Sequence, residues 1–175
     1  MRQLPRGYKI RSARKKEVRD LIALDRAASE LFRPTGLIRD MGEEPESIPA
    51  KTLSEAIAAR AVPVGAFQGK AVGFALFRWI EGAFYLDQIS VHPDHGHKGL
   101  GRALMRAVFD EARHYRASAV YLSTFRDLAW NGPFYRTLGF EEIARTDMLD
   151  WMHEIENVQS TSMDTTLRCF MRFPI

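Results

Sequence analysis

The stretch that decides the fold runs from Ala83 to Tyr115 and reads AFYLDQISVHPDHGHKGLGRALMRAVFDEARHY. Residues 85–91 are rich in aromatic and β-branched side chains, which favours a strand, and Pro93 ends it. From Leu100 onward, apolar residues recur at positions i, i+3, i+4 and i+7, which predicts an amphipathic helix. The sequence therefore predicts a strand, a glycine-bearing turn and a long helix.

Three glycines, Gly96, Gly99 and Gly101, lie where the strand gives way to the helix. Because glycine has no Cβ, the main-chain N–H groups beside it can come close to a bulky anion. The start of a helix adds unpaired N–H groups and a partial positive charge. Each such contact contributes only about 0.3–1 kcal/mol at an exposed site, so several must act together. The pattern predicts a pyrophosphate cradle. The alternative is an ordinary tight turn before a core helix.

The segment VHPDHGHKGLGRAL resembles the acyl-CoA loop of the GCN5-related N-acetyltransferases, a family that carries Gln/Arg-x-x-Gly-x-Gly/Ala. The second half of that motif is matched, but Gly96 stands where Gln or Arg is usual, and His97 stands where many members have a second glycine. Main-chain amides do not depend on those side chains, so the resemblance implies an intact cradle that lacks one side-chain contact. It assigns cofactor binding to Gly96, His97, Lys98, Gly99, Leu100, Gly101 and Arg102.

Length and composition are those of a globular protein. The 175 residues suffice for one domain with a sizeable core, so we expect a single domain over residues 1–175. The net charge of +3 is too mild to indicate a nucleic-acid partner. Cys169 is the only cysteine, so no internal disulfide can form. No signal peptide opens the chain and no apolar run approaches membrane-spanning length, so we expect a cytoplasmic enzyme with no membrane partner.

The N-terminal part reads as a strand over Tyr8–Arg11 and a helix over about Lys15–Leu31. A second helix follows, with Ser47 as its N-cap. By resemblance, these helices and the segment between them form the family's substrate-side lid, in which Leu31–Ala50 selects the acceptor. Phe32, Glu30 and Asp40 would contact the acceptor. The alternative is that Phe32 belongs to the core and the acidic side chains are solvated.

Three further runs, Ala61–Phe67, Ala71–Trp79 and Ala83–Val91, are joined by short turns and predict an antiparallel meander. The helix that begins at Leu100 leads to another strand, Ala119–Thr124. A strand–helix–strand crossover places this strand parallel to Ala83–Val91. A last strand is predicted over Leu167–Phe173. We therefore expect an α/β (α+β) fold with a mixed, mostly antiparallel sheet of about six or seven strands. By resemblance, the parallel pair splays apart at its C-terminal ends, where such sheets bind ligands.

The segment WNGPFYRTLGF, residues 130–140, looks like the closing helix of the family and the strand after it. Gly139 is predicted to end that helix. Many members carry an Asn seven positions before the tyrosine that matches Tyr135, but this chain has Leu128 there and Asn131 only four positions before. Asn131 is the candidate for that cofactor contact. The segment Asp147–Asn157 reads as helical or irregular.

Acetyl transfer to an amine requires a neutral amine, and deprotonating a lysine-like amine at pH 7 costs about 4–5 kcal/mol. A general base offsets part of that cost. Asp87 in the central strand is the candidate, and Glu81 is less well placed. Strand alternation predicts that Gln88 faces away from Asp87. The alternative role for Asp87 is a structural hydrogen bond at the rim of the sheet.

By resemblance, the main chain of Ile89 and Val91 holds the pantetheine arm and the oxyanion, and Tyr135 lies near the cofactor sulfur. Because the pKa of a phenol lies above that of a thiol, complete proton transfer to the thiolate is uphill by about 2 kcal/mol. We therefore expect Tyr135 to donate a hydrogen bond first. The alternative is a core tyrosine whose hydroxyl is bonded to a main-chain carbonyl.

Other chemistries have weaker support. His92, His95 and His97 suit a turn as well as a metal site, and we expect no metal. The Ser123-Thr124 pair lacks a Gly-x-Ser-x-Gly setting, which argues against a hydrolase. The glycine turn lacks the Gly-Lys-Ser/Thr ending of a P-loop.

Two functions follow. The first is an N-acetyltransferase that moves an acetyl group from acetyl-CoA to a primary amine by direct attack in a ternary complex. The alternative is a non-catalytic acyl-CoA-binding regulatory module, which the departures at Gly96 and Leu128 favour. The acidic end of the lid suits a cationic amine, such as a polyamine, a peptide amine or an aminoglycoside, but the sequence does not identify the acceptor. A homodimer is compatible with the chain.

Overall fold

A computed structural model describes residues 4–175, and its centre is a sheet of seven strands in the order β1-β2-β3-β4-β5-β7-β6. All neighbouring strands are antiparallel except β4 and β5. The mixed sheet with one parallel pair confirms the predicted fold class. The strands are β1 (Tyr8–Ser12), β2 (Pro63–Phe67), β3 (Lys70–Ile80), β4 (Ala83–Val91), β5 (Ala119–Phe125), β6 (Glu141–Glu142) and β7 (Arg168–Pro174).

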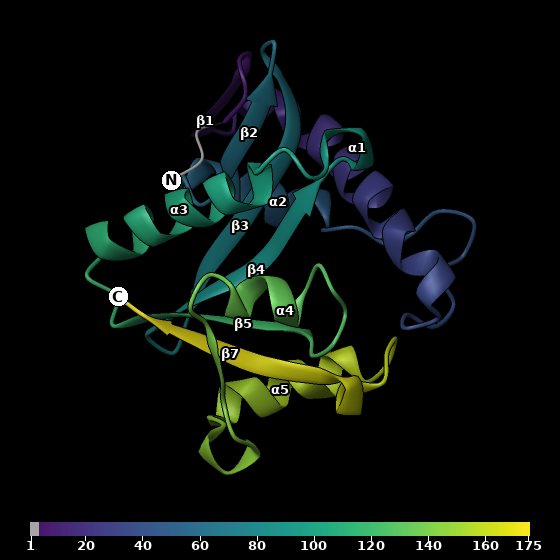
Figure 1. The fold of residues 1–175 in the computed structure, drawn as a ribbon, viewed down its shortest axis with the longest axis vertical. Coiled ribbons are helices and arrows are strands. Elements are labelled where there is room, and N and C mark those ends of the chain that lie inside the picture. Colours follow the sequence, from purple (N-terminus) through teal and green to yellow (C-terminus); the bar gives the residue numbers. More distant parts are fainter. Residues whose placement is uncertain (1–3) are drawn as a thin grey trace.

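Helices cover both faces of the sheet (Figure 1). One face carries α3 (Leu100–His114) and α4 (Gly132–Arg136), which share the largest apolar cluster with the sheet. The other face carries α1 (Val18–Ser29) and α2 (Ala50–Ala58) over its first strands and α5 (Asp150–Gln159) over its last. Short 3₁₀ turns connect these elements: η1 (Lys15–Glu17), η2 (Glu30–Thr35), η3 (Pro93–His95), η4 (Arg145–Asp147) and η5 (Thr165–Leu167).

Helix α3 approaches the sheet closely at its first turn. Leu100 is only 1% exposed, and a Cβ built on Gly65 would lie 2.5 Å from its Cδ1 atom. A Cβ on Gly73 would lie 3.0 Å from its Cδ2 atom. Glycine at both positions therefore makes room for the leucine, and this contact fixes the start of α3 against β2 and β3.

Two boundaries differ from the sequence-based expectation. The predicted first helix divides into η1, α1 and η2, and Gly36, at φ +67°, ends η2. Ser47 was the predicted N-cap of the next helix, and this is wrong, because α2 begins at Ala50 with Pro49 as its N-cap. The Ser47 hydroxyl instead donates to Asp25 of α1 at 2.9 Å. The segment predicted as helical or irregular is helix α5.

The parallel strands β4 and β5 pair at three positions: Phe84 with Val120, Tyr85 with Tyr121 and Leu86 with Leu122. Beyond them, β4 continues beside β3 to residue 91, while β5 continues beside β7 to residue 125. The two strands therefore diverge, with β4 running up towards α1 and β5 running along β7 (Figure 1). The predicted splay between the parallel strands is confirmed.

A β-bulge lies where the two strands separate. Leu76 of β3 pairs with Gln88 and Phe77 pairs with Leu86, which leaves Asp87 without a partner in β3. A bulge bends its strand and increases the local twist, so it helps β4 turn away from β5. It also interrupts the alternation of side chains along β4.

Candidate active site

The turn before α3 presents main-chain N–H groups that the protein does not use. The amide of Gly96 donates to Pro93 O and that of Ala103 donates to Gly99 O. Between them, the amides of residues 97–102 have no hydrogen-bond acceptor anywhere in residues 4–175. His97 and Gly99 have φ values of +56° and +81°, so the chain curls through left-handed conformations before the helix begins. This row of unpaired amides at a helix start has the chemistry of an anion-binding site.

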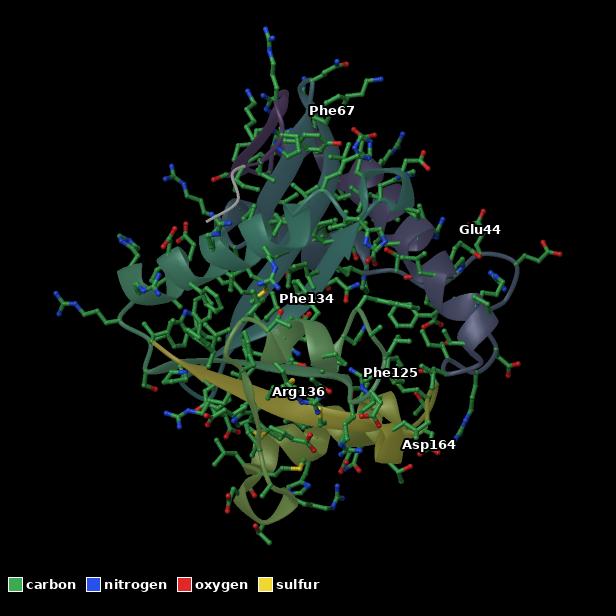
Figure 2. The ribbon with its side chains drawn as sticks, in the orientation of Figure 1. Glu44, Phe67, Phe125, Phe134, Arg136 and Asp164 are labelled. Atoms are coloured by element: carbon green, nitrogen blue, oxygen red, sulfur yellow. The ribbon has the colours of Figure 1, made fainter. Side chains whose placement is uncertain are left out.

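Side chains beside this turn tie it to α4. The Arg102 guanidinium donates to Thr137 Oγ1 at 2.6 Å and lies 5.7 Å from the centre of the Phe134 ring. A Cβ on Gly101 would lie 3.5 Å from the same ring, which is an ordinary packing distance. Phe134 is labelled at α4 in Figure 2. The Lys98 ammonium donates to the main-chain oxygen of Asp94. Arg102 and Lys98 thus add positive charge on either side of the amides.

The three histidines of the turn have separate contacts. His95 Nδ1 shares a hydrogen bond of 2.7 Å with the Tyr8 hydroxyl, and burial together with the charge of Lys98 lowers the pKa of His95. His92 Nδ1 accepts from the amide of Asp94. His97 is exposed. Across residues 4–175, no group of three or more His, Cys, Asp or Glu side chains is arranged to hold a metal ion.

Tyr135, in α4, is 7% exposed and packs between Phe134 and Phe140 at ring-centre distances of 5.2 and 5.6 Å. Its hydroxyl makes no hydrogen bond with any group of residues 4–175, so the alternative of a hydroxyl bonded to a carbonyl finds no support. Burial raises the pKa of Tyr135, and the nearby Tyr85 raises it further. The phenol therefore remains protonated at neutral pH and is available as a donor.

Asp87 lies on the bulge of β4, and its carboxylate pairs with Arg78 of β3 at 3.1 Å. The sequence-based expectation that Gln88 faces away from it is wrong, because the bulge shifts the alternation. Arg78 lies over the Tyr85 ring on the face covered by α1 and α5, and Gln88 bonds to α1 on that same face. Glu81 lies in the turn before β4, about 20 Å along the strand from the bulge. It is therefore at the wrong end of the strand to act as a base.

The main chain of Ile89 and Val91 lies in the part of β4 that has no partner in β5. Both residues pair with β3 on the other side, with Ala75 and Gly73 respectively. Their side chains contact the α3 cluster. This exposed edge of β4 is available to a ligand that lies between the diverging strands.

Asn131 is the N-cap residue of α4, and its Oδ1 accepts a hydrogen bond of 2.8 Å from Thr124 of β5. Its amide donates to Leu128 O at 2.8 Å, so the two positions that differ from the family's spacing meet in one turn. A Cβ on Gly132 would lie 2.1 Å from Arg126 O, so only glycine lets α4 start this close to the end of β5. This packing fixes Tyr135 one turn later.

The predicted lid contacts the C-terminal part of the chain. Phe32 contacts Phe125 of β5 and Trp130 at ring-centre distances of 5.7 and 6.2 Å. Ile38 forms a β-bridge with Met163 in the loop before β7. The lid segment thus joins the α5–β7 loop. Figure 2 labels Phe125 and, in that loop, Asp164.

The two acidic lid residues proposed for the acceptor face solvent. Glu30 pairs with Arg33 at 2.7 Å, and this hydrogen bond lowers the pKa of Glu30. Asp40 is exposed and has φ +46°. Of the three lid residues predicted to contact the acceptor, Phe32 is the one that lies against the end of β5.

A buried polar network, which was not predicted from the sequence, surrounds Asp25. Asp25 of α1 is 3% exposed and accepts hydrogen bonds from Gln88 Nε2 at 2.8 Å and Ser90 Oγ at 2.6 Å. Ser47 and the amide of Ile48 also donate to it. The signal was present, because Asp25 occupies the apolar face of its helix. This network links α1, the lid and the free part of β4.

Comparison with known proteins agrees with this geometry. The family model described as "Acetyltransferase (GNAT) family" matches residues 25–140. The fold is similar to the ribosomal-protein-S18-alanine N-acetyltransferase from Escherichia coli, with 20% identity, a TM-score of 0.68 and coverage of 96% of this chain and 94% of that chain. It is also similar to the PaiA N-acetyltransferase from Thermoplasma acidophilum in complex with coenzyme A, with 13% identity, a TM-score of 0.71 and coverage of 96% and 99%. A third similar structure is YncA from Salmonella typhimurium with acetyl-CoA, with 20% identity, a TM-score of 0.66 and coverage of 96% and 94%.

Helices in the described part of the chain, residues 4–175, are too short or too polar to cross a membrane.

Proposed function

Because the chain belongs to the acetyltransferase (GNAT) family, it transfers an acetyl group from acetyl-CoA to an amine, and we propose that the transfer takes place between the diverging ends of β4 and β5. The observation that carries this proposal is the row of unpaired amides from residue 97 to residue 102. These amides lie at the start of α3, directly after β4, so a diphosphate bound there leaves its attached chain beside the free edge of β4. Acetyl-CoA supplies the thioester, and the residues of this chain bind it and move the protons.

The first requirement is to hold the cosubstrate. The amides of His97, Lys98, Gly99, Leu100, Gly101 and Arg102 donate to the diphosphate, and the partial positive charge of the helix start strengthens each contact. The Gly96 amide is bonded to Pro93 O, so that residue shapes the turn rather than donating. The Asn131 side chain, with its oxygen engaged by Thr124, has its NH₂ group left to donate.

The second requirement is a neutral amine. We call the space between the diverging ends of β4 and β5 the gap. Asp87 lies where the two strands separate, on the face of the sheet opposite α3 and α4, so it can accept the amine proton directly or through water. Its ion pair with Arg78 is partly exposed, because the side chains of Arg78 and Asp87 are 49% and 32% accessible. Such pairs contribute little to stability. Arg78 therefore positions the carboxylate, and protonation of Asp87 loses only a weak ion pair.

The third requirement is to stabilise charge on the reacting atoms. Main-chain groups of Ile89 and Val91 at the free edge of β4 are fixed donors and acceptors for the acyl arm and the oxyanion. Tyr135 donates a hydrogen bond to the leaving thiolate, since its hydroxyl has no other partner in residues 4–175 and burial raises its pKa. Direct attack of the amine on the thioester then needs no covalent enzyme intermediate.

Turnover of acetyl-CoA with a panel of primary amines tests this proposal. Free thiol release should require both acetyl-CoA and an amine, and mass spectrometry should detect the N-acetylated product. Binding of coenzyme A by calorimetry without thiol release for any amine would contradict it and support the non-catalytic acyl-CoA-binding alternative. Absence of coenzyme A binding would contradict both.

Three expectations from the sequence stay predictions: a single domain over residues 1–175, a cytoplasmic location and a homodimer. Limited proteolysis, cell fractionation and light scattering test them in that order.

A further inference from the structure

Arg168, the first residue of β7, forms its side-chain hydrogen bonds with neutral partners rather than with a carboxylate. Its Nε donates to Gln159 Oε1 at 3.0 Å and its Nη2 donates to Ser123 Oγ at 3.2 Å, and both acceptors are neutral. No ion pair within residues 4–175 includes Arg168. By contrast, eight other arginines pair with a carboxylate: Arg11, Arg26, Arg33, Arg78, Arg113, Arg126, Arg136 and Arg145.

The Arg168 side chain is partly buried. Burial lowers the pKa of Arg168, and its Cζ atom lies 4.7 Å from the centre of the Phe125 ring. A guanidinium has five N–H donors, and two are used here, one each by Gln159 and Ser123. The three remaining N–H groups have no acceptor in residues 4–175 and are not enclosed by the protein, so they are available to an anion.

Arg168 lies close to residues on both sides of the gap. It is close enough to Tyr85 of β4 and to Tyr135 of α4 for its charge to influence the pKa of both. These tyrosines lie on opposite faces of the sheet, so Arg168 lies near the proposed site of acetyl transfer. The stacked Phe125 ring also contacts Phe32 of the lid. Arg168 is therefore on the lid side, opposite the cofactor turn.

There is room for a small molecule next to the guanidinium. A cavity of about 360 Å³ between α5, η5 and β7 is lined by Arg168, Ser123 and Gln159, which are hydrogen-bonded to one another, and it meets β5 at Ser123. The charged neighbours Arg126 and Arg145, which also line it, are already paired with Glu142 and Glu156. Arg168 therefore provides the unbalanced positive charge of this cavity.

We propose that Arg168 binds a carboxylate of the acceptor, and that the acceptor is a small primary amine that also carries a carboxylate, the chemical class of the free amino acids. The planar guanidinium matches a carboxylate in bidentate geometry. A single unpaired guanidinium balances one negative charge, which favours a carboxylate over a doubly charged phosphate. The inference rests on the proposed transfer between β4 and β5 and names the substrate class of that site.

The test compares amino acids with their matched carboxamides, which keep the amine and the side chain but lack the negative charge. Wild-type protein should acetylate the acids with at least tenfold higher kcat/KM than the amides. Calorimetry in the presence of coenzyme A should show the same preference in binding. If wild-type protein acetylates amides as well as or better than acids, the inference fails while the proposed function stands. If no amine is acetylated, the proposed function fails.

Two variants locate the effect. Arg168→Gln should reduce the preference for acids to within about twofold and leave kcat/KM for the amides within about threefold of wild type, because it removes the charge alone. Arg168→Lys should retain part of the preference, since it keeps the charge and loses the planar fork. Arg113→Gln, an exposed position on α3 that pairs with Asp110, is the matched control and should keep the full preference. An unchanged preference in folded Arg168→Gln protein, checked by thermal melting and coenzyme A binding, would overturn the inference.

Discussion

Replacing Tyr135 by Phe removes one hydroxyl group from the centre of the proposed site. The ring is 7% exposed and stays packed between Phe134 and Phe140, so the substitution leaves the apolar core intact. Since the hydroxyl has no hydrogen-bond partner in residues 4–175, its loss orphans no other protein group. We therefore expect the midpoint of thermal unfolding to change by no more than about 2 °C, which for a domain of this size is under about 1 kcal/mol.

Activity should respond much more strongly than stability. A hydrogen bond to a charged group contributes about 1.5–3 kcal/mol, and every 1.4 kcal/mol is a tenfold change in rate, so kcat should fall by about 10- to 150-fold. The affinity for coenzyme A should stay within about threefold, because the unpaired amides of residues 97–102 hold the diphosphate.

The assay measures thiol release under saturating acetyl-CoA, together with calorimetric binding of coenzyme A and a melting curve. Tyr115→Phe is the control, because Tyr115 is 44% exposed at the end of α3 and should behave like wild type. A Tyr135→Phe protein with wild-type kcat would refute the role of the hydroxyl. A large loss of stability would indicate that the hydroxyl is structural.

Three further changes probe the other parts of the site and the fold. Asp87→Asn should lower kcat/KM by about 100-fold or more and weaken the rise of kcat/KM with pH, as expected for a general base. An unchanged rise in the variant would exclude Asp87 as that base. Gly99→Ala should strain the left-handed turn by about 1 kcal/mol or more and weaken coenzyme A binding at least fivefold, while Gly69→Ala, at φ +86° in the β2–β3 turn, should carry the strain without the binding loss. Burial raises the pKa of Glu17, but hydrogen bonds from Arg11 and a main-chain amide lower it more, so the net shift is downward. A lowered pKa stabilises the fold above the ordinary glutamate pKa of about 4.3 and the benefit is lost as the pH falls through the folded value. Glu17→Gln should therefore cost about 2 kcal/mol at pH 7 and flatten the acid limb of stability in chemical denaturation; an unchanged limb would contradict this.

The strand, turn and helix from Ala83 to Tyr115 could be predicted because each is specified by local sequence. Periodicity of two and of 3.6 residues distinguishes strand from helix, and closely spaced glycines between them predict exposed amides. The order of β2, β3, β4 and β5 followed from short turns and one crossover, whereas the places of β1, β6 and β7 were not predicted. These features depend on residues that are near one another in the chain, so a single sequence is enough to find them.

Other features depend on partners that are distant in the chain. The bulge at Asp87 reflects the register between β3 and β4, which the sequence of β4 alone does not specify, and this is why the expected orientation of Gln88 was wrong. Ser47 has the chemistry of an N-cap, but buried Asp25 needs donors and takes its hydroxyl instead. Arg168 was predicted in the last strand, yet its lack of an acidic partner becomes visible only when the whole chain is folded.

The short join between β4 and β5 has a consequence for how the molecule reports what it binds. Within residues 4–175, three pairs of residues link the four N-terminal strands directly to the three C-terminal ones. A ligand bound between the diverging strands would add contacts across this seam of three residue pairs. Trp151 is 2% exposed and contacts Tyr85 and Tyr121, one on each side of that seam, at ring-centre distances of 5.5 and 5.8 Å. We therefore expect the fluorescence of Trp151 to change if ligand binding alters the packing across this seam.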